Sequence, residues 1–318
     1  TSGSGTFNLE DADGNQIVQG SAGSVGQGAS ETQDELLGYK SLNIRKSLNR
    51  YKKNRNNLDE SKGWGETFGS YITRDQNNQN LALSYEFLSL GVNLINPLEN
   101  SDFIISFETG RQNFTKDHSI NHIGMLSGVN FNNLHSETFI LGGVTIHDSK
   151  RTILTNTTTT GTLDIDDSYF SLNTLAGSEL NNIKLIPDIG FTAGYSITPQ
   201  HGESKYYSWD TKSILNLSAY LEDEYNFKII NENNNLNLGW VIDYRKLIFG
   251  KEQDYEINGT NATYTQTDDL TEELTFSINL DFNKKISNSG TFAFGFDAFH
   301  STQETSSFQG NINYTSKF

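Results

Sequence analysis

The sequence predicts an all-β protein, a twelve-stranded antiparallel transmembrane β-barrel with an N-terminal α-helix in its lumen. Three observations support this prediction. Apolar and polar residues alternate along long segments from residue 63 onward, which is the period of a β-strand. One helical pattern, at residues 31–58, precedes those segments. The segments are joined alternately by short and by longer connections, as in barrels of the outer membrane.

The composition narrows the class of protein. Lys and Arg number 23 against 39 Asp and Glu, so the net charge is −16, and we expect no nucleic-acid partner. Aromatic residues make up 12% of the chain, which separates it from acidic disordered chains. With 0 Cys, a disulfide framework and a cysteine metal site are excluded, and we expect no cofactor. The N-terminus lacks a signal pattern, so we expect any export signal to lie upstream.

Residues 1–30 are rich in Gly, Ser and Ala and contain few large apolar side chains. Such a segment buries too little surface to offset the loss of chain entropy on folding. We therefore expect a flexible linker, or the end of something larger that precedes it.

Residues 31–62 are predicted to be one long α-helix and its connection to the first strand. Ser30 and Gln33 form a capping box, and an apolar stripe at helical spacing includes Leu37, Ile44 and Leu48. The 28 residues from 31 to 58 would extend about 42 Å at 1.5 Å per residue. The helix is strongly cationic, through Lys40, Arg45, Lys46, Arg50, Lys52, Lys53 and Arg55.

Residues 63–318 are predicted to be the barrel. Phe292, Phe294 and Phe296, for example, alternate with small or polar residues, so each strand has one apolar face. The predicted strands cover residues 63–74, 81–94, 102–113, 120–131, 135–148, 165–178, 182–196, 207–230, 236–249, 271–283, 290–302 and 306–318. Residues 139–146 are apolar on both faces in places.

A soluble β-sandwich would also bury one face of each strand, so alternation alone leaves that alternative open. Strands in soluble proteins average about 5–6 residues, however, and those predicted here are about twice as long. Tilted strands of that length match a membrane-spanning apolar band. No run of 18 apolar residues occurs in the sequence, which argues against a membrane-spanning helix.

The acids of the predicted strands fall on their polar face and would line the lumen. They are Glu108, Asp188, Glu222, Asp243, Asp281 and Asp297, and Glu86 is expected there as well. Opposite charges away from bulk water attract strongly. We therefore hypothesise that the cationic helix threads this acidic lumen and plugs it.

The chain resembles the translocator β-domain of autotransporters, the type V secretion proteins of Gram-negative bacteria, over residues 31–318. The resemblance lies in the helix before the barrel, the strand that begins Gly63-Trp64-Gly65, the twelve strands and a last strand ending in an aromatic residue. That last strand resembles the signal read by the barrel-assembly machinery, carried by Gly310, Ile312, Tyr314 and Phe318.

The resemblance implies an outer-membrane protein transporter without catalysis of its own. An N-terminal passenger would be exported to the cell surface, residues 1–30 would be the end of that passenger or its linker, and the lipid bilayer and the assembly machinery would be partners. One full barrel per chain implies a monomer. Some members cleave themselves at an Asn pair in the helix, and Asn56-Asn57 is such a pair.

Two other functions remain open from the sequence. A porin-like channel would share the barrel, although it does not need a plug that continues into an N-terminal linker. An outer-membrane hydrolase would use Ser, His and Asp near the rim, where four His are expected. Those residues are His118, His147, His201 and His300. The six His of the chain show no metal-ligand spacing.

Overall fold

The structure confirms the predicted fold class: it is a closed antiparallel β-barrel with an α-helix inside it. The computed structural model describes residues 6–10, 16–21, 33–56, 63–75, 84–114, 118–133, 135–154, 162–180, 187–203, 207–228, 234–258, 263–267, 271–287 and 290–316.

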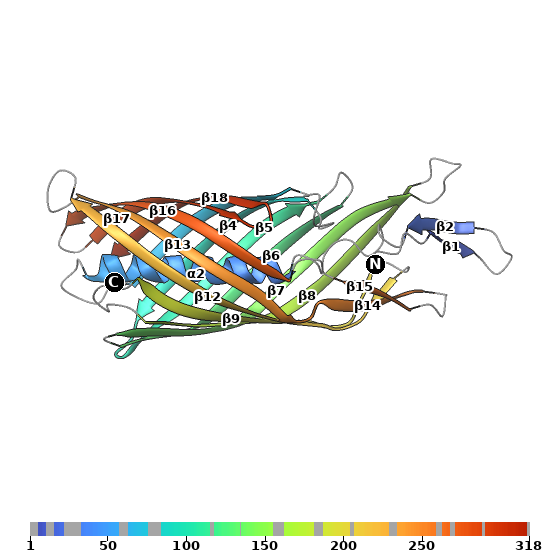
Figure 1. Cartoon of the computed structure of the whole chain (residues 1–318), viewed down its shortest axis with the longest axis horizontal. Helices are drawn as coiled ribbons and strands as arrows, with labels where there is room; N and C mark the ends of the chain where they lie inside the picture. Colours follow the sequence, from blue (N-terminus) through green and yellow to red (C-terminus); the bar gives the residue numbers. More distant parts are fainter. Residues whose placement is uncertain are drawn as a thin grey trace.

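Twelve strands form the barrel, and each pairs antiparallel with the next one along the chain. They are β3 (Gly63–Arg74), β4 (Tyr85–Pro97), β5 (Ser101–Asn113), β6 (His118–Asn132), β7 (Ser136–Leu154), β8 (Thr162–Leu180), β9 (Asp188–Thr198), β12 (Lys212–Lys228), β13 (Asn234–Phe249), β16 (Glu272–Ser287), β17 (Gly290–Ser301) and β18 (Thr305–Ser316). The last strand pairs with the first, from Thr305 opposite Arg74 to Ser316 opposite Gly63, and this closes the barrel. The strands cross the barrel at a marked tilt (Figure 1).

The outer surface of the barrel is apolar. Along β17 and β18 the outward positions include Phe294, Phe296, Ile312 and Tyr314, each about half exposed, whereas the side chains between them are turned inward and mostly buried. Large apolar side chains are exposed in the same way on each of the remaining barrel strands. Such a band is the lipid-facing surface of a transmembrane β-barrel.

Among the described residues, no helix is both long and apolar enough to cross a membrane.

The two ends of the barrel differ. At the short-turn end, few residues separate β4 from β5, β6 from β7 and β16 from β17, and β3 begins there beside the end of β18. At the opposite, long-loop end a four-stranded sheet stands beyond the barrel, made of β10 (His201–Glu203), β11 (Tyr207–Trp209), β14 (Glu252–Ile257) and β15 (Thr263–Thr267). The long connections were predicted, but β10, β14 and β15 within them were not, and β11 was predicted as the start of the barrel strand 207–230. Strands of three to six residues carry too little alternation to be recognised.

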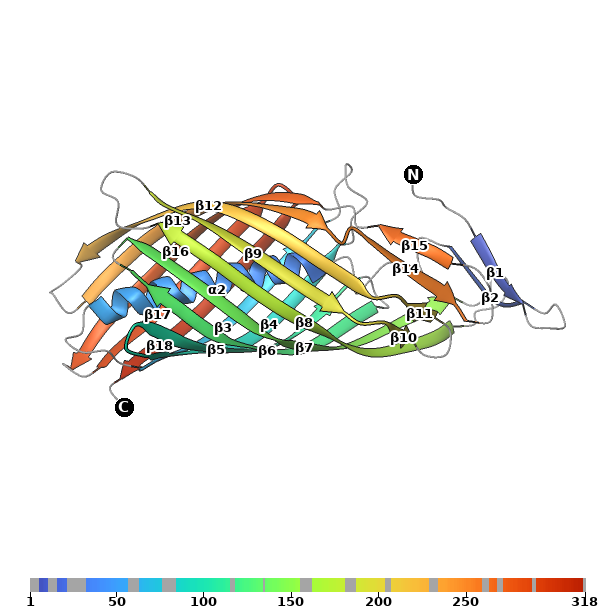
Figure 2. The same ribbon diagram turned by 90° about the horizontal axis from the view of Figure 1, so that it is seen from below.

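The helix α2 (Gln33–Asn56) lies inside the barrel along its long axis (Figure 2). Its 24 residues extend about 36 Å at 1.5 Å per residue. Glu35 near its start is paired with Arg74, at the long-loop end of β3, whereas Tyr51 near its end contacts Trp64, at the short-turn end of β3. The helix therefore runs from the long-loop end to the short-turn end. The predicted cap Ser30 and the predicted last helical residue, Leu58, both lie outside the described residues.

The N-terminal residues form a hairpin where the sequence predicted a flexible linker. β1 (Thr6–Glu10) pairs with β2 (Gln16–Ser21), with Leu9 opposite Val18. Thr6, Phe7, Ile17 and Val18 favour strands, which gives this short pairing a local basis. The hairpin lies at the long-loop end (Figure 1), where β2 is beside β7. The division of the chain into linker, helix and barrel remains a proposal.

The side chain of Glu86 points outward, against the expectation that it faces the lumen. The inward positions of this part of β4 belong to Tyr85 and Phe87, which are buried together with Ile72. The alternation misleads there because the inner face of β4 is apolar at this end, while its buried Ser89 and Asn93 further along are polar.

Candidate functional site: the interface between the helix and the lumen

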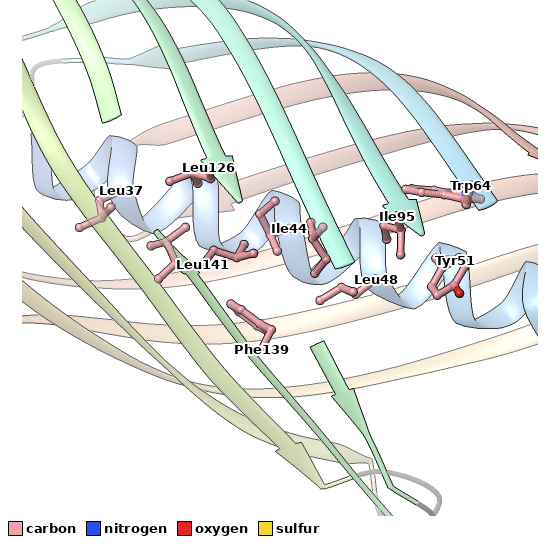
Figure 3. Packing of buried hydrophobic residues seen from close by; sticks show 11 residues of the cluster. Leu37, Ile44, Leu48, Tyr51, Trp64, Ile95, Leu126, Phe139 and Leu141 are labelled. Carbon is pink, nitrogen blue, oxygen red and sulfur yellow. The ribbon is translucent and has the colours of Figure 1, made fainter. Parts of the chain in front are cut away.

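One side of α2 is apolar and packs on the inner wall of the barrel (Figure 3). Leu37, Ile44, Leu48 and Tyr51 follow one stripe at helical spacing, and each of them is buried. They belong to one cluster with wall residues that come from β3 to β8: Trp64, Ile95, Ile104, Leu126, Phe139, Leu141 and Leu175.

This packing explains why residues 139–146 are apolar on both faces. Phe139 and Leu141 point inward to the helix, while Ile140 and Ile146 point outward and are each half exposed. Where the apolar stripe of α2 covers the wall from β3 to β8, the inward side chains of the wall are therefore apolar as well. This stripe helps to fix the rotation of the helix about its axis, together with Leu36 and Tyr39, which pack against a second apolar cluster of the wall.

The cations of α2 face carboxylates of the wall. Lys40 Nζ lies 3.7 Å from Glu108 on β5, and Arg45 Nη2 lies 3.0 Å from Asp243 on β13. The guanidinium carbon of Arg45 is also 3.4 Å from the centre of the Tyr220 ring. A cation over an aromatic face gains further attraction when water is excluded.

Arg50 is at the centre of the largest group of charges. Its Nε is 2.7 Å from Glu66 Oε1, and its Nη1 is 3.1 Å from Asp297 and 4.0 Å from Asp281. Lys46 Nζ reaches the same Asp297 at 3.5 Å. Glu66 also accepts a hydrogen bond from Ser47 of the helix. These charged groups are nearly buried, so their attraction is stronger than that of a pair at the surface.

Toward the short-turn end the contacts continue to the last described turns of α2. The Tyr51 hydroxyl donates to Asp102 at 3.0 Å, and Lys52 Nζ is 3.5 Å from Glu137. Lys53 pairs with Glu224, and Asn49 donates to Glu222. The side chains of Lys52 and Lys53 are about one-third exposed, so this end of the helix is the wetter one.

At the long-loop end the charges are reversed, because the helix carries the acids and the wall carries the cations. Arg245 of β13 lies 2.5 Å from Asp34 and also pairs with Glu273 of β16 at 2.7 Å. On another part of the wall, Arg74 of β3 pairs with Glu35. Each carboxylate also accepts a hydrogen bond from a neutral side chain of the wall. Asn216 donates to Asp34 at 2.8 Å, and the Tyr85 hydroxyl donates to Glu35 at 2.7 Å.

The structure brings together most of the charged residues proposed from sequence. Lys40, Arg45, Lys46 and Arg50 meet Glu108, Asp243, Asp281 and Asp297, as given above. Glu222 contacts Asn49 rather than a cation, and Asp188 lines a cavity beside the helix. Lys52 and Lys53 pair with other acids, and the side chain of Arg55 and all of Asn57 lie outside the described residues.

Several partners were not found from the sequence, namely Glu66, Arg74, Asp102, Glu137, Glu224 and Arg245. Glu66 and Arg74 share the inward parity of Trp64 in β3, with inward burial at every second residue. That signal is weak because the inward face of β3 mixes aromatic with charged side chains. Asp34 and Glu35 were visible only as acids in the first helical turn, where the helix dipole alone accounts for them.

The residues proposed as an assembly signal lie on β18. Ile312 and Tyr314 face outward and are about half exposed, and Gly310 is on the same face. Phe318 lies outside the described residues. The role of this strand in assembly stays a proposal.

The four predicted rim His are in or beside the wall. His147 Nε2 is 3.0 Å from Ser171 Oγ, His118 is 3.3 Å from Ser149 Oγ, His300 is 2.9 Å from Ser306 Oγ and His201 Nδ1 is 2.6 Å from Asp167. The His147 and His201 rings each stack on Tyr169, at 4.7 and 4.4 Å between centroids. Within the described part of the chain, no three His, Asp or Glu side chains gather in a way that could hold a metal ion.

The described residues line several small cavities beside the helix. One of about 200 Å³ lies near the short-turn end, between α2 and the wall at Glu222, Trp240 and Asp281. Others along the helix measure about 30, 20 and 10 Å³. One water needs about 10–15 Å³, so each of those three has room for about one or two waters. The arrangement is that of a filled lumen.

Solved structures share this fold. The translocator domain of the autotransporter NalP from Neisseria meningitidis aligns with a TM-score of 0.57 and 12% identity, over 92% of this chain and 100% of that chain. The toluene transporter TbuX from Ralstonia pickettii aligns with a TM-score of 0.50 and 8% identity, over 82% of this chain and 90% of that one. At these identities the similarity concerns the fold, and at that level the predicted resemblance to autotransporter translocator domains is confirmed. No protein-family model and no curated protein matches the sequence.

Proposed function

We propose that this chain is an outer-membrane translocator that exports or anchors an N-terminal passenger at the cell surface. The observation that supports it most is the path of the chain. The segment just before the barrel runs through the lumen as α2, from the long-loop end to the short-turn end, and then enters β3. A chain leaving the barrel in the N-terminal direction therefore emerges at the long-loop end.

The sides of the membrane follow from the same asymmetry. Barrels of this kind have short turns at the periplasmic side and longer loops outside. The short-turn end would then be periplasmic, and the hairpin of β1 and β2 would be at the cell surface. The protein named in the similar Neisseria structure is an autotransporter, which is consistent with this proposal.

The partners follow from the proposal. The bilayer contacts the outward apolar band, and the barrel-assembly machinery would insert the barrel by reading β18. The closed barrel consists of a single chain, which supports a monomer. We infer no enzymatic activity for the barrel, and the His side chains near the rim are assigned to the packing of the wall.

The first experiment places an epitope before Thr1, behind an export signal, and exposes intact cells to antibody and external protease. The proposal expects the epitope at the surface and a protease-resistant barrel. An epitope that becomes accessible only after the outer membrane is opened would place the N-terminus in the periplasm and overturn the proposal. The matched control carries the same epitope in the turn between β6 and β7, which the proposal places in the periplasm. That epitope should become accessible only when the outer membrane is opened.

A channel is the second candidate, because the similar Ralstonia barrel is described as a toluene transporter. The filled lumen favours the translocator over the channel. Reconstituted in planar bilayers, the intact protein should conduct ions poorly, whereas the chain without residues 33–56 should conduct strongly. A large steady conductance from the intact chain would favour the channel.

A further inference from the structure

The long-loop end of the lumen is a site for two adjacent carboxylates. Arg74 and Arg245 come from separate parts of the wall and hold Glu35 and Asp34, which are neighbours in the first turn of α2. We call these four residues the clasp. All four are buried, with at most 7% of any residue exposed. Within the wall, Glu273 shares Arg245, so the wall contributes two cations and one carboxylate to this region.

The clasp fits the shape of the helix as well as its charge. Gly38 lies one turn after Asp34, and the side chain of Arg245 crosses the helix at this glycine. A Cβ added to Gly38 would lie 2.6 Å from Arg245 Cδ, so a larger residue would displace the arginine. Neutral groups also contact both acids, since Asn216 reaches Asp34 and Tyr85 reaches Glu35. The wall thus recognises an acidic pair followed by a glycine.

Not every cation further along the helix opposes an axial slip. Lys46 and Arg50 are one turn apart, and both already contact Asp297, at 3.5 and 3.1 Å. A slip by one turn, 5.4 Å, would place Arg50 where Lys46 was and leave a cation at Asp297. At the clasp the same slip would place Gly38 and Tyr39 where Asp34 and Glu35 were, so both buried arginines would lose their carboxylates on the helix. Single polar contacts of this kind set the register in helical coiled coils.

We propose that the clasp is an axial stop: it binds the acidic pair of the exported chain and ends outward movement of the helix at one register. The inference rests on the proposed export function for its direction of movement, whereas the register that it fixes can be measured independently. The ligand class is a vicinal pair of carboxylates on a helix, with glycine one turn later. The clasp also explains why the acids occur at the one end of a cationic helix that meets arginines.

The test reads the register by crosslinking, which is simple because the chain has 0 Cys. Gln309 of β18 donates to Asn43 of α2 at 3.2 Å, so Gln309→Cys with Asn43→Cys reports the native register. Gln309→Cys with Ser47→Cys reports a helix displaced outward by one turn. Both pairs are treated with a short bifunctional thiol reagent in folded protein isolated from the outer membrane.

In the otherwise unchanged chain the Asn43 pair should crosslink at least ten times more than the Ser47 pair. Glu35→Arg or Arg74→Glu alone should reduce that ratio to about one or below, and the two together should restore it because the ion pair is rebuilt with reversed charges. Lys246→Glu is the matched control, since Lys246 neighbours Arg245 but its side chain is 54% exposed on the outer face, where it pairs with Glu272. The control should leave the ratio unchanged.

Folded Glu35→Arg and Arg74→Glu proteins that keep the native ratio would overturn the clasp. If either variant fails to insert, Glu35→Gln and Arg74→Gln are measured instead. The same fall in the crosslinking ratio is expected, and its absence would again overturn the clasp. The outcome is separable from the proposed function. If the epitope is periplasmic but the ratio falls in the clasp variants as expected, export is refuted and the clasp stands. If the epitope is at the surface but the ratio does not fall in those variants, export stands and the clasp is refuted.

Discussion

Replacing Arg50 by methionine tests whether buried charge pairs hold the helix in the barrel. The change removes a guanidinium that is 2.7 Å from Glu66 and 3.1 Å from Asp297, and it keeps much of the aliphatic stem. Both carboxylates stay buried, with side-chain exposures of 0% and 3%. Removing one partner of a buried pair typically costs about 3–5 kcal/mol, because the remaining charge is left uncompensated.

The expected loss is therefore about 3–5 kcal/mol in the free energy that keeps α2 docked, or roughly 100- to 4,000-fold in the docking equilibrium. Trp64 is a reporter of docking, since its ring lies 6.1 Å from that of Tyr51 on the helix. Guanidinium titrations of the protein in micelles, followed by tryptophan fluorescence, would measure the change for Arg50→Met against the parent chain.

Lys52→Met is the matched control. Lys52 pairs with Glu137 at 3.5 Å, but its side chain is 31% exposed, so the expected loss is about 0–1 kcal/mol. Adding Glu66→Gln to Arg50→Met should recover part of the loss, because it removes the buried negative charge that has lost its cation, whereas Asp297 keeps Lys46. If Arg50→Met cost no more than Lys52→Met, the buried ion pairs would not be what holds the helix, and the apolar cluster would have to account for docking.

Three further predictions follow from the same contacts. Deleting residues 33–56 leaves acids of the wall without their cations, so the open barrel should be clearly cation-selective in a salt gradient across a planar bilayer; a pore selective for anions would contradict the acidic lumen. Gly38→Leu should displace Arg245 and cost about 1–3 kcal/mol of docking free energy in the fluorescence titration, as overpacking does elsewhere; an unchanged midpoint would show that Arg245 has room to move. Phe296→Arg places a charge near the middle of the apolar band and should cost about 2–4 kcal/mol of barrel stability in vesicles, whereas Tyr225→Arg, near the end of β12, should cost about 0–1 kcal/mol; equal losses would mean that the band does not lie in the bilayer.

The local chemistry of the sequence was enough to predict the barrel. Period-two alternation is a property of each strand by itself, so β3 is found at 63–74 as predicted and the other eleven lie close to their predicted ranges. The cationic helix could be predicted equally well, because its charge and its helical spacing are properties of one continuous segment.

The partners of the helix could not be read in the same way. Which acid meets which cation depends on how far the helix is inserted and how it is rotated, and both are set by contacts between segments distant in the sequence. Arg50 meets Asp297 across 247 positions. Asp34 meets Arg245 across 211 positions, with the sign of charge reversed from the rest of the helix.

The sequence by itself therefore determined an apolar outer surface, a polar interior and a cationic helix, since each of these is a local pattern of side chains. The tertiary structure alone decided that the apolar wall residues which meet the apolar stripe of α2 come from β3 to β8, and which charged wall residues meet its charged side chains. It also decided that the helix is clasped at its acidic end. The physical reason is that closing the barrel brings β3 and β13 to the same helical turn, and no pattern within either strand specifies that meeting.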